Sequence, residues 1–125
     1  MKLTLKEEER LIIFNIAEIA RRRWCSGLKL NYVEADALIC DELLERGRAG
    51  MNTLAELIEL GSQIITKEDV MEDTEQLLPL IQLEILFPDG NKLVSVHEPI
   101  RLSKRSEAIP KNELISMRYY DKCCM

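Results

Sequence analysis

Apolar residues in the first part of the chain recur at steps of three and four, which is the spacing of one face of an α-helix. The segment opens with Thr4-Leu5-Lys6-Glu7, a capping box in which Thr4 and Glu7 satisfy each other's backbone amides. It ends in three arginines and Trp24 before Gly27, which suits a helix C-terminus. A helix is therefore predicted over about residues 5–24. Its apolar positions are Leu11, Ile12, Phe14, Ile16, Ile19 and Ala20.

Two further segments carry the same start signal. Asn31–Glu34 predicts a second helix that ends near Gly47 or Gly50. Thr53–Glu56 predicts a short third helix that stops at Gly61. The apolar residues expected to face inward from this third helix are Leu54, Leu57 and Ile58.

A fourth start signal is weaker. In Thr66-Lys67-Glu68-Asp69 the closing residue is an aspartate, whose side chain is shorter than that of glutamate. It predicts one or two helical turns from Val70 to about Leu77, because Pro79 ends them.

The hydrophobic period then changes from helical spacing to two. The apolar residues Ile81, Leu83, Ile85 and Phe87 recur at every second position, and Leu93–Val96 repeats this period. The positions between the first four are Gln82, Glu84 and Leu86. Pro88–Asn91 between the two segments is a turn, in which Gly90 accepts a positive φ without steric cost. The pattern predicts a β-hairpin from Leu80 to about His97.

The composition shifts again after residue 100. Arg101–Glu107 is charged and has little to bury, which is typical of a linker. Leu114–Tyr120 could add a strand, although nothing in the sequence fixes its partner. We therefore expect a domain over residues 1–100, followed by a linker and a divergent C-terminal tail over 101–125.

The elements together predict an α+β fold, a small bundle of about four helices packed with a C-terminal antiparallel β-hairpin. A two-stranded hairpin is marginal alone, so it must pack on the helices or pair with another chain. Leu80, Leu86 and Leu93 would lie on its outer face, and such apolar surfaces are more often interfaces than exteriors.

Length and composition fit one folded domain. The chain has 125 residues, with 46% hydrophobic and 31% charged residues. No apolar run reaches the roughly 18 residues of a membrane span, and the N-terminus lacks the order of a secretory signal. We therefore expect a cytoplasmic protein with reduced thiols and no membrane partner.

Few residues could support catalysis. The single histidine, His97, lies at a predicted strand end, where a structural or interface role is favoured over catalysis. The spacings of Cys25, Cys40, Cys123 and Cys124 match no zinc pattern. The acidic clusters fall in first helical turns, where the helix dipole accounts for them. The sequence thus indicates no catalytic, metal or cofactor site in this chain.

A nucleic-acid partner is disfavoured. The net charge of −5 repels phosphate backbones. Arg21-Arg22-Arg23-Trp24 is the one basic cluster with an aromatic residue, but consecutive helical residues point in different directions. Ion pairs or snorkelling side chains are favoured over phosphate contact.

Several segments resemble the urease gamma subunit family in the same order along the chain. They are Leu28–Ala35, Leu54–Gly61, Asp69–Glu72 and, as the most specific segment, Phe87–Ile100. The resemblance covers about residues 1–100.

The resemblance implies an α+β scaffold subunit that assembles with a beta and an alpha subunit into a trimer of heterotrimers. In that family nickel and the catalytic residues belong to the alpha chain, so this chain would hold no cofactor. The complex would hydrolyse urea to ammonia and carbamate, which makes this chain a subunit of an enzyme without catalytic residues of its own. The segment around the hairpin would lie at a subunit boundary. Its candidate interface residues are Leu86, Phe87, Pro88, Asp89, Gly90, Leu93, Val94, Val96, His97, Pro99 and Ile100.

A different class of function stays open. The arginine cluster and leucine-rich faces could belong to a free-standing helical module that binds protein or nucleic acid. Copurification with a large nickel protein would favour the first interpretation, and a monomer that shifts labelled oligonucleotides would favour the second.

Overall fold

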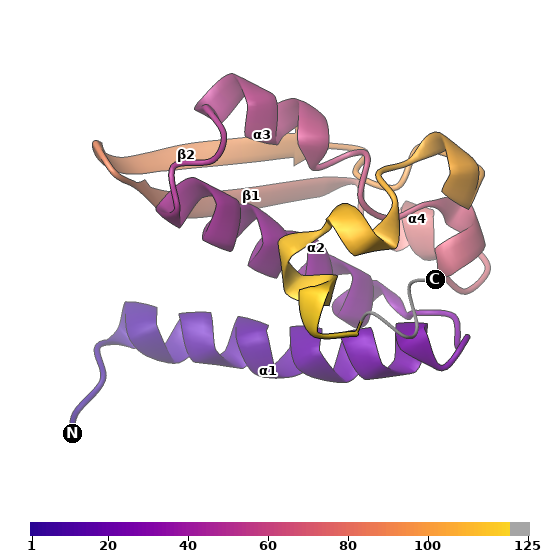
Figure 1. Ribbon diagram of the computed structural model, residues 1–125, viewed down its shortest axis with the longest axis horizontal. Coiled ribbons are helices and arrows are strands. Elements are labelled where there is room, and N and C mark those ends of the chain that lie inside the picture. The colour runs from indigo at the N-terminus through magenta and orange to yellow at the C-terminus, as the bar shows by residue number, and fades with distance from the viewer. Residues whose placement is uncertain (121–125) are drawn as a thin grey trace.

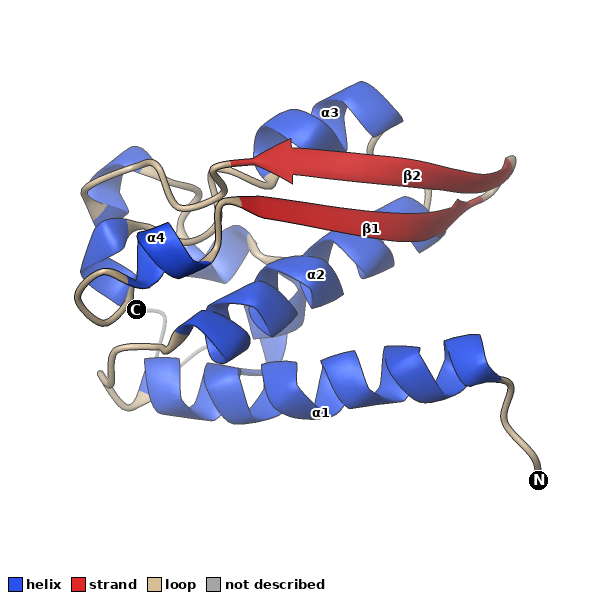
Figure 2. Cartoon of the chain, turned by 180° about the vertical axis from the view of Figure 1, so that it is seen from behind, coloured by secondary structure: helices blue, strands red, loops and turns tan. Residues whose placement is uncertain are grey.

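A computed structural model describes residues 1–120, without the side chains of residues 116 and 119. Helix α1 (Leu5–Cys25) lies alongside α2 (Tyr32–Arg48), and α2 lies between α1 and a two-stranded antiparallel hairpin (Figure 1). The short helix α3 (Leu54–Leu60) packs on the second strand, and α4 (Thr74–Leu77) precedes the first (Figure 2). The predicted α+β class, with about four helices and a hairpin, is confirmed.

Three of the four start signals form helices with the predicted caps. In α1 the Thr4 amide donates to Glu7 at 2.9 Å, and the Glu7 amide donates to the Thr4 hydroxyl at 3.2 Å. The same reciprocal bonds join Asn31 with Glu34 and Thr53 with Glu56. These caps depend on residues three positions apart, so local sequence suffices to specify them.

The fourth signal does not open the predicted helix over residues 70–77. The Asp69 carboxylate does accept from the Thr66 amide at 2.8 Å, but only a 3₁₀ turn forms, over Lys67–Asp69. Val70 is then drawn into a parallel bridge with Leu30, in which the Leu30 amide donates to the Asp69 carbonyl and the Met71 amide donates to the Leu30 carbonyl, both at 2.9 Å. This pairing extends the backbone, so α4 begins only at Thr74.

The hairpin forms as predicted. Strand β1 (Leu80–Phe87) pairs with β2 (Gly90–His97) from Leu80 opposite His97 to Phe87 opposite Gly90. Gly90 has φ +129°, a value that side chains with a Cβ rarely adopt. The turn chemistry and the alternation of side chains thus fix the same register.

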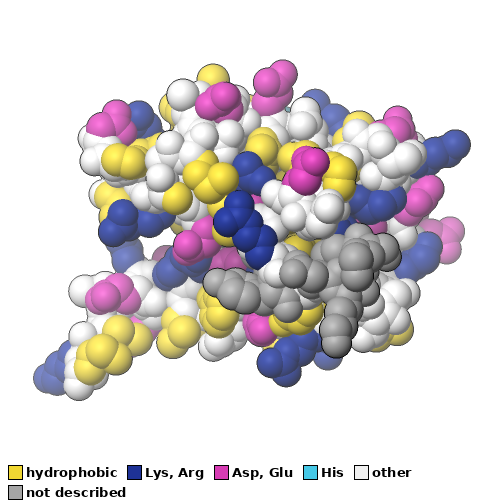
Figure 3. All heavy atoms as spheres, viewed as in Figure 1, with side chains coloured by type: hydrophobic (Ala, Val, Ile, Leu, Met, Phe, Trp, Pro, Cys, Tyr) yellow, Lys and Arg dark blue, Asp and Glu magenta, His cyan; other side chains and the backbone are white. Residues whose placement is uncertain are grey.

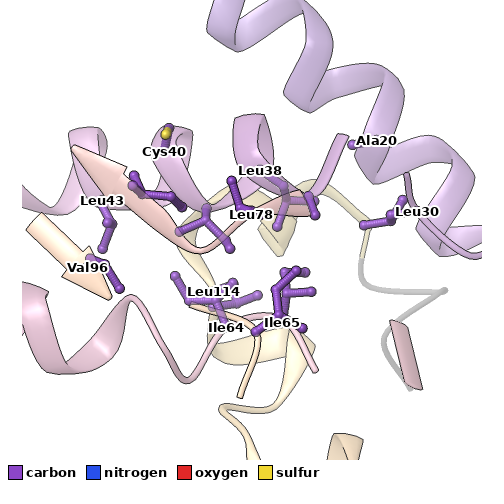
Figure 4. Packing of buried hydrophobic residues seen from close by; sticks show 14 of the residues in the cluster. Ala20, Leu30, Leu38, Cys40, Leu43, Ile64, Ile65, Leu78, Val96 and Leu114 are labelled. Carbon is purple, nitrogen blue, oxygen red and sulfur yellow. The ribbon is translucent and has the colours of Figure 1, made fainter. Parts of the chain in front are cut away.

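One core joins the helices to the hairpin. It includes Leu38, Ile39 and Leu43 from α2, and Ile85 and Val96 from the strands. Figure 4 shows side chains from α2, the loop at Ile64 and Ile65, and the C-terminal segment meeting in this core. Because α2 contributes to both the α1 contact and the hairpin contact, it is the central element of the fold.

The C-terminal segment differs from its sequence prediction. Leu114–Tyr120 adds no strand, since Ile115–Tyr120 forms 3₁₀ turns. Shorter 3₁₀ turns precede it, over Arg105–Glu107 and Lys111–Glu113. Leu114 and Met117 are fully buried, so this segment contributes to the core. The domain boundary at residue 100 stays a prediction.

The apolar face predicted for α1 is only partly buried within the chain. Ala17, Ala20 and Trp24 are buried, and they meet the body at the C-terminal half of the helix. The N-terminal half of α1 lies below the hairpin, whose turn reaches further to the left (Figure 1). Four of the predicted core residues of α1 are exposed, namely Leu11, Ile12, Phe14 and Ile19. The predicted inward position of Ile58 in α3 is also wrong, since that side chain is exposed.

Candidate functional site

The two faces of the hairpin have opposite surroundings. Ile85, Phe87 and Val94 point into the core and are at most 4% exposed. On the outer face Leu80, Leu86 and Leu93 are 39%, 50% and 62% exposed. The outward position predicted for these three leucines is therefore found in the structure, and it leaves apolar surface uncovered within this chain.

The structure divides the candidate interface residues into two groups. The buried group serves the core of this chain, so its members cannot be the main contact surface for another protein. It consists of Phe87, Val94, Val96, Pro99 and Ile100. The accessible group surrounds the turn and the outer face, and consists of Leu86, Pro88, Asp89, Leu93 and His97, with Gly90 half-buried.

A groove of about 1000 Å³ runs between α1, α2 and β1. Leu80 and Leu86 line its hairpin side, while Ile13 and Ile16 line its α1 side. One exposed ion pair crosses it, from Lys6 Nζ to Glu84 Oε1 at 2.8 Å. Figure 3 shows the surface hollowed between the N-terminal half of α1 and the hairpin. The groove thus continues the apolar outer face of β1 towards the exposed part of α1.

Cys40 and Asp36 of α2 lie in this groove, and the Cys40 thiol donates to Asp36 Oδ1 at 3.3 Å. Burial raises the pKa of the Cys40 thiol well above its usual value, and the neighbouring Asp36 carboxylate adds to that shift. Burial also raises the pKa of Asp36, against the opposing effect of the hydrogen bond from Cys40. A thiol held protonated in this way is a poor nucleophile, so Cys40 is a structural residue.

The arginine cluster of α1 is neutralised within the chain. Arg21 Nη1 donates to Asp41 Oδ2 at 2.7 Å, and Arg21 Nε donates to Glu18 Oε1 at 2.9 Å. Arg23 pairs with the buried Glu34 carboxylate. Burial lowers the pKa of Arg21, but its bonds to Asp41 and Glu18 outweigh this and leave the pKa raised. The ion-pair interpretation of this cluster is therefore the one that the structure supports.

Metal-binding side chains do not converge in the part of the chain that the structure describes. Among residues 1–120 no three His, Cys, Asp or Glu side chains gather so that they could hold a metal ion. His97 is exposed at the end of β2. Nor is any described helix long and apolar enough to cross a membrane. The distinctive surface feature among the described residues is the exposed apolar outer face of the hairpin.

The cysteines give a mixed result. Cys40 is a free thiol, as expected, whereas Cys25 is disulfide-bonded in the structure, which contradicts the expectation of reduced thiols for that residue. Cys123 and Cys124 lie outside the described residues.

Comparison with protein families decides between the open interpretations. The family model described as urease, gamma subunit, matches residues 1–100. The chain belongs to the urease gamma subunit family. The resemblance noted in the sequence is thereby confirmed. Membership identifies the chain as a urease subunit, hence part of a hydrolase complex that associates with other urease subunits.

Two features of this urease subunit were not predicted from its sequence. The apolar residues of α1 were expected in the core, and no packing was assigned to residues 101–120. For the second, the spacing of Leu114 and Met117 is a weak signal, because residues three apart share one side of a helical turn.

Proposed function

We propose that this chain is the non-catalytic structural gamma subunit of a nickel-dependent, cytoplasmic urease that hydrolyses urea to ammonia and carbamate. Its partners are the beta and alpha subunits, in a trimer of heterotrimers. The observation that carries the proposal is the uncovered apolar outer face of the hairpin, Leu80, Leu86 and Leu93, in a chain of the urease gamma family. A subunit whose role is contact needs such a surface.

The contact surface extends beyond the hairpin. Leu11, Ile12 and Phe14 of α1 are each more than 40% exposed, and the groove joins this helix to the outer face of β1. Interfaces of obligate complexes bury large areas with an apolar centre. Exposed leucines and isoleucines on two elements with a groove between them suit the binding of a neighbouring subunit.

Nickel belongs to the alpha subunit in this proposal. The described residues of this chain do not fit a dinuclear nickel site, because such a site needs several convergent imidazole and carboxylate ligands. We expect the purified chain alone to bind no stoichiometric nickel and to hydrolyse no urea. Elemental analysis and an ammonia-release assay check this, and one equivalent of tightly bound nickel in the isolated chain would contradict it.

Replacing Leu86 with aspartate tests the contact surface. Leu86 is half exposed, while its neighbours Ile85 and Phe87 are buried, so the substitution leaves the core of the chain intact. We expect nearly unchanged helical circular dichroism but reduced incorporation into the complex. The reason is that an unpaired carboxylate buried at an interface costs several kcal/mol. Size-exclusion chromatography of coexpressed subunits measures incorporation.

Ile58→Asp is the matched control. Ile58 is an aliphatic residue of α3 that is also exposed, at 41%, and it lies outside the hairpin. It should incorporate normally. Normal incorporation of the Leu86→Asp chain would show that this face of the hairpin faces solvent in the complex, and loss of helix would place Leu86 in the core instead.

A further inference from the structure

Residues 101–120, named the strap here, lie outside the segment that the urease gamma family model matches. In Figure 1 the strap, coloured orange to yellow, leaves the end of the hairpin and crosses α2 towards α1. It has few backbone contacts within itself beyond short 3₁₀ turns. Its conformation therefore depends on the surface beneath it.

The first part of the strap is fixed by Arg105. Its Nη1 atom donates to the Ile64 carbonyl at 2.7 Å and to Asp69 Oδ2 at 2.9 Å. Asp69 is buried and also accepts from Trp24 Nε1 at 3.0 Å. The Arg105 guanidinium and the Lys111 ammonium lie 5.3 and 4.3 Å from the centre of the Trp24 ring, within cation–π range. The strap thus covers Trp24, which is 3% exposed.

The second part inserts two apolar side chains. Leu114 and Met117 are 0% exposed and belong to the same cluster as Leu38 and Ile64 (Figure 4). Charged groups of α2 hold the backbone on either side of Leu114. Arg46 Nη2 donates to the Glu113 carbonyl at 3.1 Å, and the Ile115 amide donates to Glu42 Oε2 at 2.9 Å.

Backbone pairing and a distal contact complete the attachment. The Lys67 amide donates to the Leu102 carbonyl, and the Ile109 amide donates to the Gln63 carbonyl, both at 2.9 Å. Near the end of the described chain the Tyr120 hydroxyl donates to Glu18 Oε2 at 2.6 Å. Side chains that fix backbone groups, next to pockets for apolar residues, are the means by which proteins bind extended peptides.

We propose that the strap is an intramolecular ligand of the urease gamma domain. It occupies a peptide-binding groove formed by α2, residues 63–69 and the C-terminal end of α1. The groove accepts a segment of short 3₁₀ turns in which an arginine precedes two apolar residues that are three positions apart. In this chain the strap closes the groove to partner chains. The inference goes beyond the proposed function and rests on the family domain alone. Its test is therefore independent of whether the chain is incorporated into a urease.

The test cuts the covalent link between the strap and the domain and keeps both fragments in the same sample. A site for a specific protease is inserted between Ser103 and Lys104, which are both exposed, in the full chain. The cut protein is kept in reducing buffer because Cys25 is disulfide-bonded in the structure. We expect the two fragments to elute together at the mass of one chain, and an excess of fluorescent peptide of residues 104–120 to replace the resident strap.

Trp24 reports on the strap directly, since it is the only tryptophan in the chain. Dilution of the cut protein should red-shift Trp24 emission and raise its quenching by acrylamide as the strap leaves, with the helical circular dichroism retained. Added peptide should reverse both changes. Peptide carrying Leu114→Asp and Met117→Asp should fail to do so, whereas peptide with Asn112→Asp, at an exposed position, should bind as the unmodified one does.

Three results would overturn the proposal. If the fragments separate with no change in Trp24 emission or quenching, the strap has no groove to occupy. Loss of helical circular dichroism as the strap leaves would make the strap an indispensable part of the folding unit, not a ligand of it. Elution of the uncut chain as a dimer, reduced to monomer by excess peptide, would mean that the groove receives the strap of a second copy.

Discussion

Replacing Gly47 with valine is expected to destabilise the folded chain by about 3 kcal/mol or more, the upper range for overpacking a core. Gly47 lies inside α2, where a Cβ atom would come within 2.3 Å of Ile85 Cγ2 and 3.4 Å of Leu57 Cδ1. Ile85 is fully buried, and its branched Cβ restricts its χ1 rotamers, so it cannot move aside at low cost. Urea denaturation followed by circular dichroism measures the loss.

Two variants test whether the close approach of the new side chain to Ile85 causes the loss of stability. Ala55→Val introduces the same side chain at an exposed position of α3, and should cost only the helix propensity difference of about 0.6 kcal/mol. Gly47→Ala combined with Ile85→Ala should be less destabilising than the sum of the two single changes, because the second removes the atom that the first meets. Strict additivity in this cycle would refute a clash between residues 47 and 85.

Replacing Asp41 with alanine should cost roughly 3–5 kcal/mol, the range for breaking a buried ion pair by removing one partner. The Asp41 and Arg21 side chains are each 3% exposed and lie 2.7 Å apart. Arg10 also pairs with Asp41, at 2.8 Å. Alanine would leave two guanidinium groups between α1 and α2 without this carboxylate. The free energy of unfolding in urea gives the magnitude.

The surface pair Lys6 and Glu84 is the control, because it has similar geometry, 2.8 Å, but side chains that are 70% and 51% exposed. Glu84→Ala should change stability by about 0–1 kcal/mol. A double replacement, Arg21→Met with Asp41→Leu, should recover most of the loss, since it leaves no buried charge in the pair. If Asp41→Ala and Glu84→Ala reduce the free energy of unfolding equally, burial does not determine how much these ion pairs stabilise the fold.

The arginine cluster shows what sequence patterns leave open. Its charges were visible in the sequence, and ion pairing was favoured over phosphate contact. The partners, Asp41 and Glu34, lie on α2, 20 and 11 residues away from the arginines they bind. No spacing rule within one helix connects them, because their distance is set by how α1 packs on α2.

The sequence by itself determined the elements whose causes are local. The three complete capping boxes, at Thr4, Asn31 and Thr53, start helices because the bonding groups are three residues apart. The turn at Pro88–Gly90 and the alternation around it determine the hairpin, since a shift of one residue would turn every buried side chain outward. The urease gamma family could also be recognised from the sequence, because its most specific segment is this continuous hairpin.

Only the tertiary structure decided where longer-range partners meet. The Asp69 carboxylate does accept from the Thr66 amide, as a fourth cap would require, but it also binds Trp24 and Arg105. The next residue, Val70, pairs with Leu30, so only a 3₁₀ turn forms there. Only one side of α1 packs on the body, which buries Ala17 and Ala20 and leaves Ile12 and Ile19 exposed. The charged composition of residues 101–107 favoured a linker, whereas burial of Leu114 depends on a site assembled from α2 and residues 64–65. In each case the free energy comes from contacts between residues far apart in the chain, which local pattern does not encode.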